Sequence, residues 1–286
     1  PSNKSLEKIY LSDWANSYEG TKSPLVKHLA NQFNRSFYLS SKSKLGFTNI
    51  ESLSCNNNKL KWSRIKGQLD LIEIILDKPL KAEEKITIYL NYQIKIPDDK
   101  FTGYGINSNN RIFFRDFFIS LNPFINDEWI LQSNLGLRDN SNISSNYLIN
   151  WTYPESYNLV SNLNQIDIPK SLKNGYISTL WTASDLSSPE FIFDEEDNFK
   201  TINLDDHFTI VTDIIPKKNS EVDIEQSLKQ IYNFTNSLLS PLKQKKILIL
   251  KKDYAKILSG TNILRLSNNP IELKKGDLKF ILLKNY

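Results

Sequence analysis

The sequence of 286 residues predicts a mostly β fold, an antiparallel β-sandwich or multi-sheet domain followed by a short α+β region. Three observations support this prediction. Over several segments apolar and polar residues alternate, which is typical of half-buried strands. Short polar turns, several of them with proline, separate these segments. After Pro216 the apolar spacing becomes that of a helix, and a further apolar strand follows.

The first elements are a short strand that ends near Leu11 and a helix. Ser23 and Pro24 stand before a run of apolar residues with helical spacing that extends to Phe33. Proline is favoured in the first turn of a helix, because its missing N–H would have no partner there. We therefore expect a short amphipathic helix to begin at Pro24.

Two longer strands follow. Leu69–Leu76 is an apolar run interrupted only by two acidic residues, which predicts a buried strand. Apolar residues then occupy every second position from Ile86 to Ile96, as in a half-buried strand. Because the link over residues 78–85 is polar, we expect the two strands to pair as a hairpin.

The middle of the chain predicts several short strands. The segment 111–121 is dense in Phe and Ile, and 147–153 alternates between apolar and polar residues. A turn at residues 154–156 leads into 157–163, which we expect to lie antiparallel beside 147–153. Further strands are predicted at 175–183, 190–193 and 207–215.

The last predicted elements are a helix and a strand. Ser220 and Asp223 resemble a capping box, and the helix they precede ends before Pro241. A strand at Lys246–Leu250 follows. This change predicts a domain boundary at Asp205, with a β-rich domain over 1–205 and the opening elements of a second domain over 206–286.

Composition and charge exclude several classes of protein. With 40% hydrophobic and 24% charged residues the chain is typical of a globular protein, and no apolar run is long enough to predict a membrane span. The 36 basic and 32 acidic residues are interspersed, so no nucleic-acid partner is indicated. Cys55 is the only cysteine, which excludes an intrachain disulfide. The sequence has no Met, even at position 1, so we expect it to be a piece of a longer protein.

The sequence predicts no complete catalytic or metal site. Its two histidines, His28 and His207, are far apart, and the motifs H-E-x-x-H, C-x-x-C and G-x-x-x-x-G-K-[ST] are absent. His207 follows Asp205 and Asp206, which leaves a Ser-His-Asp arrangement formally open, but no G-x-S-x-G elbow presents a nucleophile. Both histidines are expected to be structural.

Four other clusters have a structural and a functional interpretation. Asp194–Asp197 offers oxygens for calcium but lacks the spacing of a calcium loop, and Asp98 with Asp99 fits a turn better than a catalytic pair. Gly103–Gly105 is too short to hold a phosphate, and its glycines predict a bend or a close backbone approach. The aromatic residues from Phe113 to Phe124 are expected to be core, with a ligand cleft as the alternative.

Taken together, several segments resemble the N-terminal domain of aminopeptidase N-like zinc metallopeptidases, in the form found in Bacteroidetes-type bacteria. The similarity is diffuse, covers most of the chain and includes no catalytic signature. The segments that carry it are Ile9–Tyr18, Ser23–Leu25, Phe33–Phe37, Ile96–Gly105, Asp127–Trp129, Ser133–Leu135, Leu159–Leu163 and Phe208–Asp213.

The resemblance implies a saddle-like β domain followed by the start of a thermolysin-like domain. It implies a peptide or protein substrate, and zinc bound by an H-E-x-x-H motif beyond Tyr286, so that this chain is inactive alone. It also implies an exported protein, periplasmic or in the cell envelope. Two alternatives stay open: a β-sandwich module that binds carbohydrate or protein, and a catalytically degenerate family member.

One segment matches a substrate-binding loop of the family in part. That loop, typically G-x-M-E-N, corresponds to Gly260, Thr261, Asn262 and the two residues that follow. The glycine is kept, but the methionine and the glutamate are missing, and the glutamate usually helps to hold a free α-amine. Strict aminopeptidase specificity is therefore in doubt. Gly260–Asn262 either presents its backbone to a peptide or forms a plain turn.

Overall fold

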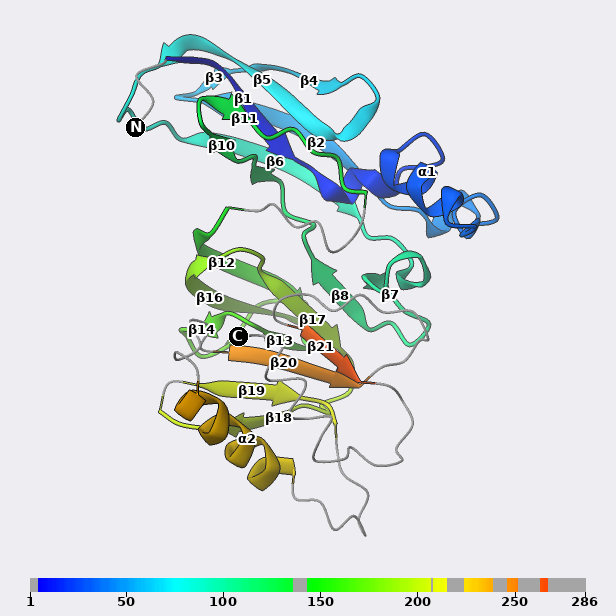
Figure 1. The fold of residues 1–286 in the computed structure, drawn as a ribbon, viewed down its shortest axis with the longest axis vertical. Helices are drawn as coiled ribbons and strands as arrows, with labels where there is room; N and C mark the ends of the chain where they lie inside the picture. Colours follow the sequence, from blue (N-terminus) through cyan, green and yellow to red (C-terminus); the bar gives the residue numbers. More distant parts are fainter. Residues whose placement is uncertain are drawn as a thin grey trace. The chain divides into compact units, whose positions relative to one another are not determined.

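The structure is a computed structural model that describes residues 5–135, 143–206, 208–214, 224–238, 246–251 and 263–266. Two compact units divide the chain: the first comprises residues up to Leu148 together with Thr182–Glu190, and the second comprises Ile149–Trp181 and the residues from Phe191 onward. Strands and their turns dominate both units (Figure 1), which confirms the mostly β fold class. The boundary between residues 205 and 206 stays a prediction.

The first unit contains a β-sandwich. One sheet has the order β4 (Lys61–Ile65), β5 (Gln68–Leu80), β1 (Leu6–Ser12) and β9 (Ser120–Leu121), and the other has the order β3 (Asn58–Lys59), β2 (Phe47–Cys55) and β6 (Ile88–Lys95). Side chains from both sheets form one hydrophobic core, whose buried members are Ile9, Leu11, Leu53, Leu60, Ile72 and Ile74. The alternation along β6 places one face of that strand against this core.

Short helices and strands complete the first unit. The helices are η1 (Trp14–Tyr18), α1 (Pro24–Asn31), η2 (Lys42–Lys44) and η3 (Asp99–Phe101), and the short strand pairs are β7 (Gly105–Ile106) with β8 (Ile112–Arg115) and β10 (Phe124–Ile125) with β11 (Glu128–Trp129). The predicted start of the helix α1 is confirmed: Ser23 Oγ accepts a hydrogen bond from the Val26 amide at 3.2 Å, and Pro24 is the first helical residue.

In the second unit one sheet is built around two long strands, β12 (Ser145–Pro154) and β16 (Tyr176–Leu186). Its order is β12, β16 and β14 (Asn164–Gln165), with β15 (Lys170–Ser171) also paired to β16. The strand β13 (Asn158–Ser161) pairs antiparallel with β17 (Glu190–Asp194), within a sheet of the order β13-β17-β8-β7. The division of the chain falls within two of these strands: β12 begins in the first unit, and β16 ends in it.

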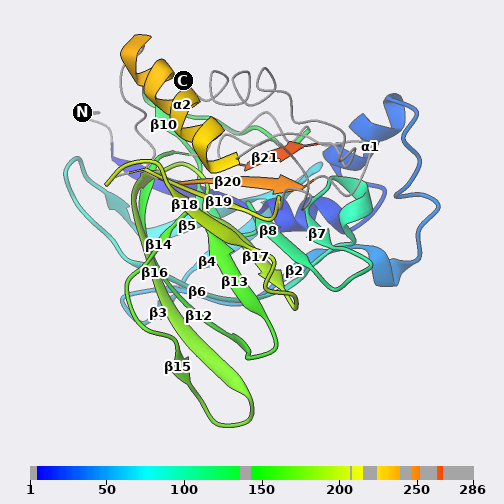
Figure 2. The same ribbon diagram turned by 90° about the horizontal axis from the view of Figure 1, so that it is seen from below.

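The other sheet of the second unit mixes antiparallel and parallel strands. Its order is β18 (Lys200–Asn203), β19 (Thr209–Thr212), β20 (Lys246–Lys251) and β21 (Ile263–Leu266). The pair β18–β19 is antiparallel, whereas β19–β20 and β20–β21 are parallel. The helix α2 (Ile224–Leu238) connects β19 to β20 and packs on one face of the sheet (Figure 2). Parallel neighbours require such a crossover, so this region is α+β as predicted.

Two predicted strand pairings are wrong. The strands β5 and β6 form no hairpin, because β1 and β4 occupy both edges of β5 and β6 pairs with β2. Likewise β12 pairs with β16 and β13 with β17, so the strands that we expected to be neighbours lie in different sheets. In both cases the strand itself was predicted correctly, and a partner from a distant segment replaced the nearest one in sequence.

Candidate functional site

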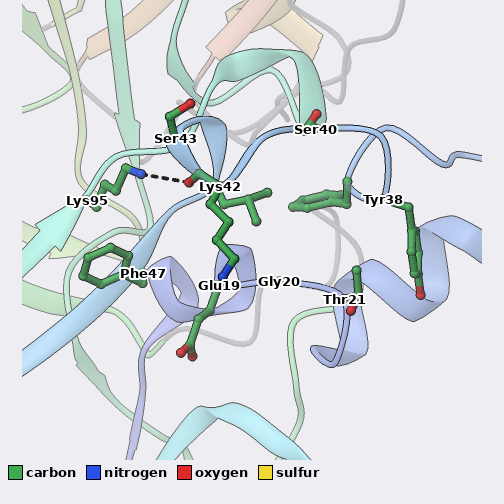
Figure 3. A pocket seen from close by; sticks show the side chains of 11 residues that line it. Glu19, Gly20, Thr21, Tyr38, Ser40, Lys42, Ser43, Phe47 and Lys95 are labelled. Carbon is green, nitrogen blue, oxygen red and sulfur yellow. Dashed lines mark hydrogen bonds between the residues drawn. The ribbon is translucent and has the colours of Figure 1, made fainter.

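A hollow with a volume of about 620 Å³ opens on the first unit, among the loops that connect η1, α1 and η2 to the sheets (Figure 3). Its lining comes from three stretches of the sequence and is formed by Glu19, Gly20, Thr21, Phe37, Tyr38, Ser40, Lys42, Ser43, Leu45, Phe47 and Lys95. The first strand residue of β2 and the last of β6 belong to it, so the sheet anchors one side. Clefts of this size take small molecules or short peptide segments.

Three charged side chains line the hollow. Lys95 Nζ donates to the backbone carbonyl of Lys42 at 2.9 Å and lies 5.9 Å from the centroid of the Phe47 ring. The Glu19 carboxylate accepts a hydrogen bond from Asn16 Nδ2 at 3.1 Å. No histidine or cysteine lies in the lining. The hollow has the chemistry of a binding site.

Aromatic residues form both the wall and the rim of the hollow. Phe37 is buried and stacks on Phe101, with ring centroids 4.0 Å apart, and it also packs against Tyr18. Tyr38 and Phe47, by contrast, leave 50% and 42% of their surfaces exposed. A fixed wall with an accessible rim suits a ligand that carries an apolar group.

A second candidate lies at the edge of the mixed sheet. Within the described part of the chain β21 stands last in the strand order, next to β20. The predicted substrate-binding residues Gly260, Thr261 and Asn262 directly precede β21 in the sequence and lie outside the described residues. An edge strand offers unpaired backbone groups with which an extended peptide can pair.

Lys246, the first residue of β20, has a largely buried ammonium group. Its Nζ donates to the backbone carbonyl of Leu163 at 2.9 Å and lies 5.5 Å from the Trp181 ring centroid. Burial lowers the pKa of Lys246 to about 8, because the charged form loses its hydration. Sequence patterns do not predict this environment, since Leu163 and Trp181 approach Lys246 only in the folded chain.

Sequence reasoning also missed a buried ion cluster around Arg115. Its Nε lies 3.1 Å from a Glu190 carboxylate oxygen and 3.2 Å from one of Asp116, and its Nη1 donates to Tyr104 Oη at 2.6 Å. Ser188 Oγ donates to Asp116 Oδ1 at 2.5 Å. Burial acts to lower the pKa of Arg115, but Glu190, Tyr104 and Asp116 outweigh it and raise that pKa. The cluster connects distant segments of the first unit.

Two buried aspartates act in the same structural way. Asp13 accepts hydrogen bonds from Thr48 Oγ1 and Arg64 Nη2, both at 2.7 Å. Asp70 accepts hydrogen bonds from Ser133 Oγ at 2.8 Å and from the Asn134 backbone amide at 2.6 Å. Burial raises the pKa of both carboxyls, and these donors offset part of the rise.

The two histidines do not come together in a described site. His28 lies in α1, where its Nε2 is 3.0 Å from the Gln32 amide nitrogen, and His207 lies outside the described residues. Within the described part of the chain no three His, Cys, Asp or Glu residues are grouped so that they could hold a metal ion. The helices of that part also include none with the length and apolar character of a membrane span.

The remaining predicted clusters have structural roles in the described chain. The Asp98 side chain accepts from the Lys100 amide and so caps η3, as expected for a turn residue. A Cβ on Gly105 would lie 2.1 Å from the Pro97 carbonyl oxygen, which confirms the close backbone approach. In the acidic cluster Asp194 ends β17, and its side chain accepts from the Glu196 amide. Three of the five phenylalanines between 113 and 124 are buried, namely Phe113, Phe114 and Phe117.

The fold is similar to that of solved zinc metallopeptidases. An M1 zinc metallopeptidase from Deinococcus radiodurans matches with a TM-score of 0.52 and 10% identity, over 96% of this chain and 55% of that chain. A two-domain M1 zinc metallopeptidase mutant bound to L-arginine matches with a TM-score of 0.51 and 10% identity, over 97% and 57%. The chain thus spans about half the length of these structures. No protein-family profile and no curated protein sequence matches it.

Proposed function

We propose that this chain is the N-terminal, non-catalytic region of an aminopeptidase N-like zinc metallopeptidase, where it helps to shape the peptide cleft and has no activity alone. The observation that supports this is the extent of the fold similarity, which covers 96% of this chain and only 55% of the M1 metallopeptidase. The order of elements agrees with it, since a β-sandwich is followed by a mixed sheet with a crossover helix.

The residues of this chain do not fit a catalytic zinc. Such a site takes three protein ligands, usually with a closely spaced pair among them. The sequence has only two histidines and no H-E-x-x-H, and its described part shows no cluster of potential ligands. We propose that the zinc ligands belong to another part of the parent protein.

The proposed substrate is a peptide or protein. Gly260–Asn262 and the edge strand β21 are the elements of this chain that we propose to face it, through backbone pairing. The glutamate expected near these positions is absent, so the proposal does not extend to recognition of a free α-amine. The proposal also includes export of the protein and its likeness to the Bacteroidetes-type form of the family, both of which rest on the sequence resemblance.

The test is to sequence the gene through roughly 50 to 100 codons past Tyr286 and to express its whole reading frame. We expect an H-E-x-x-H motif with a later glutamate, stoichiometric zinc, and release of residues from unblocked peptides. The 286-residue chain alone should bind no stoichiometric zinc and cleave nothing. A stop codon soon after Tyr286 would exclude the proposal, whereas a frame with a broken zinc motif would indicate a degenerate member.

A binding module is the second candidate, and the hollow with its exposed Tyr38 and Phe47 is the observation that favours it. Aromatic rims of this kind are used to bind carbohydrates and proteins. Screening the chain against a panel of glycans would separate the two candidates. Saturable glycan binding that Tyr38→Ser abolishes, together with a reading frame without a zinc motif, would favour the module.

A further inference from the structure

One segment of the first unit carries several basic residues and no acidic one. Residues 20–50, which we term the basic segment, contain five Lys and Arg and no Asp or Glu, which leaves 31 basic against 32 acidic residues in the rest of the chain. The five cations all have exposed side chains and are Lys22, Lys27, Arg35, Lys42 and Lys44. This segment therefore carries a net charge of a size that favours an anionic partner.

The basic segment also exposes large apolar side chains. Phe33 is 90% exposed and Leu39 is 85% exposed, although both lie in the short connection after α1. The basic segment contributes nine of the eleven residues that line the hollow and adds the half-exposed Tyr38 to its rim. Exposed apolar groups beside several positive charges are typical of a surface that binds a partner with both apolar and anionic groups.

Two lysines and one glutamate line the hollow. Lys95 Nζ donates to the Lys42 backbone carbonyl, which holds the Lys95 ammonium group at the hollow. Lys44 is already neutralised by Asp98, at 2.8 Å. The Glu19 carboxylate also lines the hollow, and it repels an anionic group of a ligand that comes close to it. A ligand that carries its negative charge toward Lys42 and Lys95 is therefore preferred over one that is charged throughout.

We propose that the basic segment and its hollow bind an extended, acidic peptide segment of a partner protein. Its carboxylates pair with Lys42 and Lys95, and an apolar side chain packs against Phe37 and Phe47. A cavity of about 620 Å³ accommodates such a side chain with its neighbouring backbone, which a flat lipid surface would leave empty. The hydroxyls of Ser40, Ser43 and Thr21 supply partners for the peptide backbone.

The experiment measures binding of the full chain to a fluorescein-labelled octapeptide of alternating glutamate and phenylalanine, by fluorescence anisotropy at low salt. The matched probe has glutamine in place of each glutamate. We expect the acidic peptide to bind with a Kd that weakens strongly between 0.05 and 1 M salt, because exposed ion pairs are screened over that range. The glutamine peptide should bind at least tenfold more weakly.

Variants locate the binding. K42Q and K95Q should each weaken the Kd about three- to fivefold, the size expected for an exposed ion pair. E19Q should leave the Kd unchanged or strengthen it, since it removes a repulsive carboxylate. K59Q is the matched control: Lys59 is an exposed lysine of the same unit, in β3, outside the basic segment. Thermal unfolding of each variant verifies that it is folded.

Three outcomes would overturn the proposal. The first is no saturable binding of the acidic peptide by the folded chain. The second is equal weakening by K42Q, K95Q and K59Q, which would mean diffuse attraction without a site. The third is tight binding to vesicles of phosphatidylglycerol, but not of phosphatidylcholine, with the peptide unbound, which would assign the basic segment to a membrane surface.

Discussion

Replacing Lys246 by methionine should stabilise the second unit near neutral pH and remove one source of its pH dependence. The Lys246 ammonium group is buried at the start of β20, between the Leu163 carbonyl and the Trp181 ring. These two contacts favour the charged form, but the loss of hydration outweighs them and lowers the pKa from 10.5 to about 8. Methionine keeps much of the apolar length of the side chain without its charge.

The expected magnitude follows from proton linkage. A fall in pKa from 10.5 to about 8 corresponds to about 3 kcal/mol. At pH 7 Lys246 keeps its proton in the folded state, and this lowers the free energy of unfolding by that amount. Between pH 8 and 10.5 the unfolded chain holds a proton that the folded chain has released, so the free energy of unfolding rises with pH. K246M removes this cost but also loses the Leu163 and Trp181 contacts, worth about 1 to 2 kcal/mol. A net gain of about 1 to 2 kcal/mol remains at pH 7.

The assay is urea unfolding of the wild type and K246M between pH 7 and 10.5. Their difference in unfolding free energy should favour K246M at pH 7 and fall by about 3 kcal/mol by pH 10.5. Lys229→Met, which removes an exposed lysine from α2 of the same unit, is the control for loss of a charge. NMR of ¹³C-labelled lysine should show one resonance that titrates near pH 8 and that K246M abolishes. A pH-independent difference, with no lysine titrating below pH 9.5, would refute the reasoning.

Three further predictions concern the first unit and the metal. Gly105→Ala places a Cβ 2.1 Å from the Pro97 carbonyl oxygen and should lower the free energy of unfolding in urea by on the order of 3 kcal/mol. Gly67→Ala is the control, with open space around the Cβ at a φ of 83°, and should cost about 1 kcal/mol. Equal costs would contradict the close approach at Gly105. Arg64→Met leaves the Asp13 carboxylate buried without its cation and should destabilise by about 3 to 5 kcal/mol, while a cost below 1 kcal/mol would mean that water reaches this pair. Zinc analysis of the purified chain should find no stoichiometric metal, and tight zinc binding would reverse the interpretation of its histidines.

Local periodicity predicted the strands and helices but not their partners. The strands at 69–76 and 86–96 and the helix after residue 223 were found where apolar spacing placed them, because burial of one face is written into consecutive residues. Pairing depends on segments far apart in the chain. The hairpin between β5 and β6 was wrong since β1, some 60 residues earlier, occupies an edge of β5.

The sites divide in the same way. The turn role of Asp98 and the close approach at Gly105 were predictable, because residue type and local neighbours decide them. The environment of Lys246 and the ion pair of Arg115 with Glu190 were not, because folding joins residues 65 or more positions apart. Gly260–Asn262 and His207 stay predictions, as they lie outside the described residues.

By itself the sequence determined the β-rich class, the late change to α+β and the lack of a metal-binding motif. Each of these depends on residue type and spacing along the chain. Only the tertiary structure decided which strands pair, and that Lys42 and Lys95, 53 positions apart, meet at one hollow. The physical reason is that burial and charge contacts act across space, whereas sequence patterns report only neighbours along the backbone.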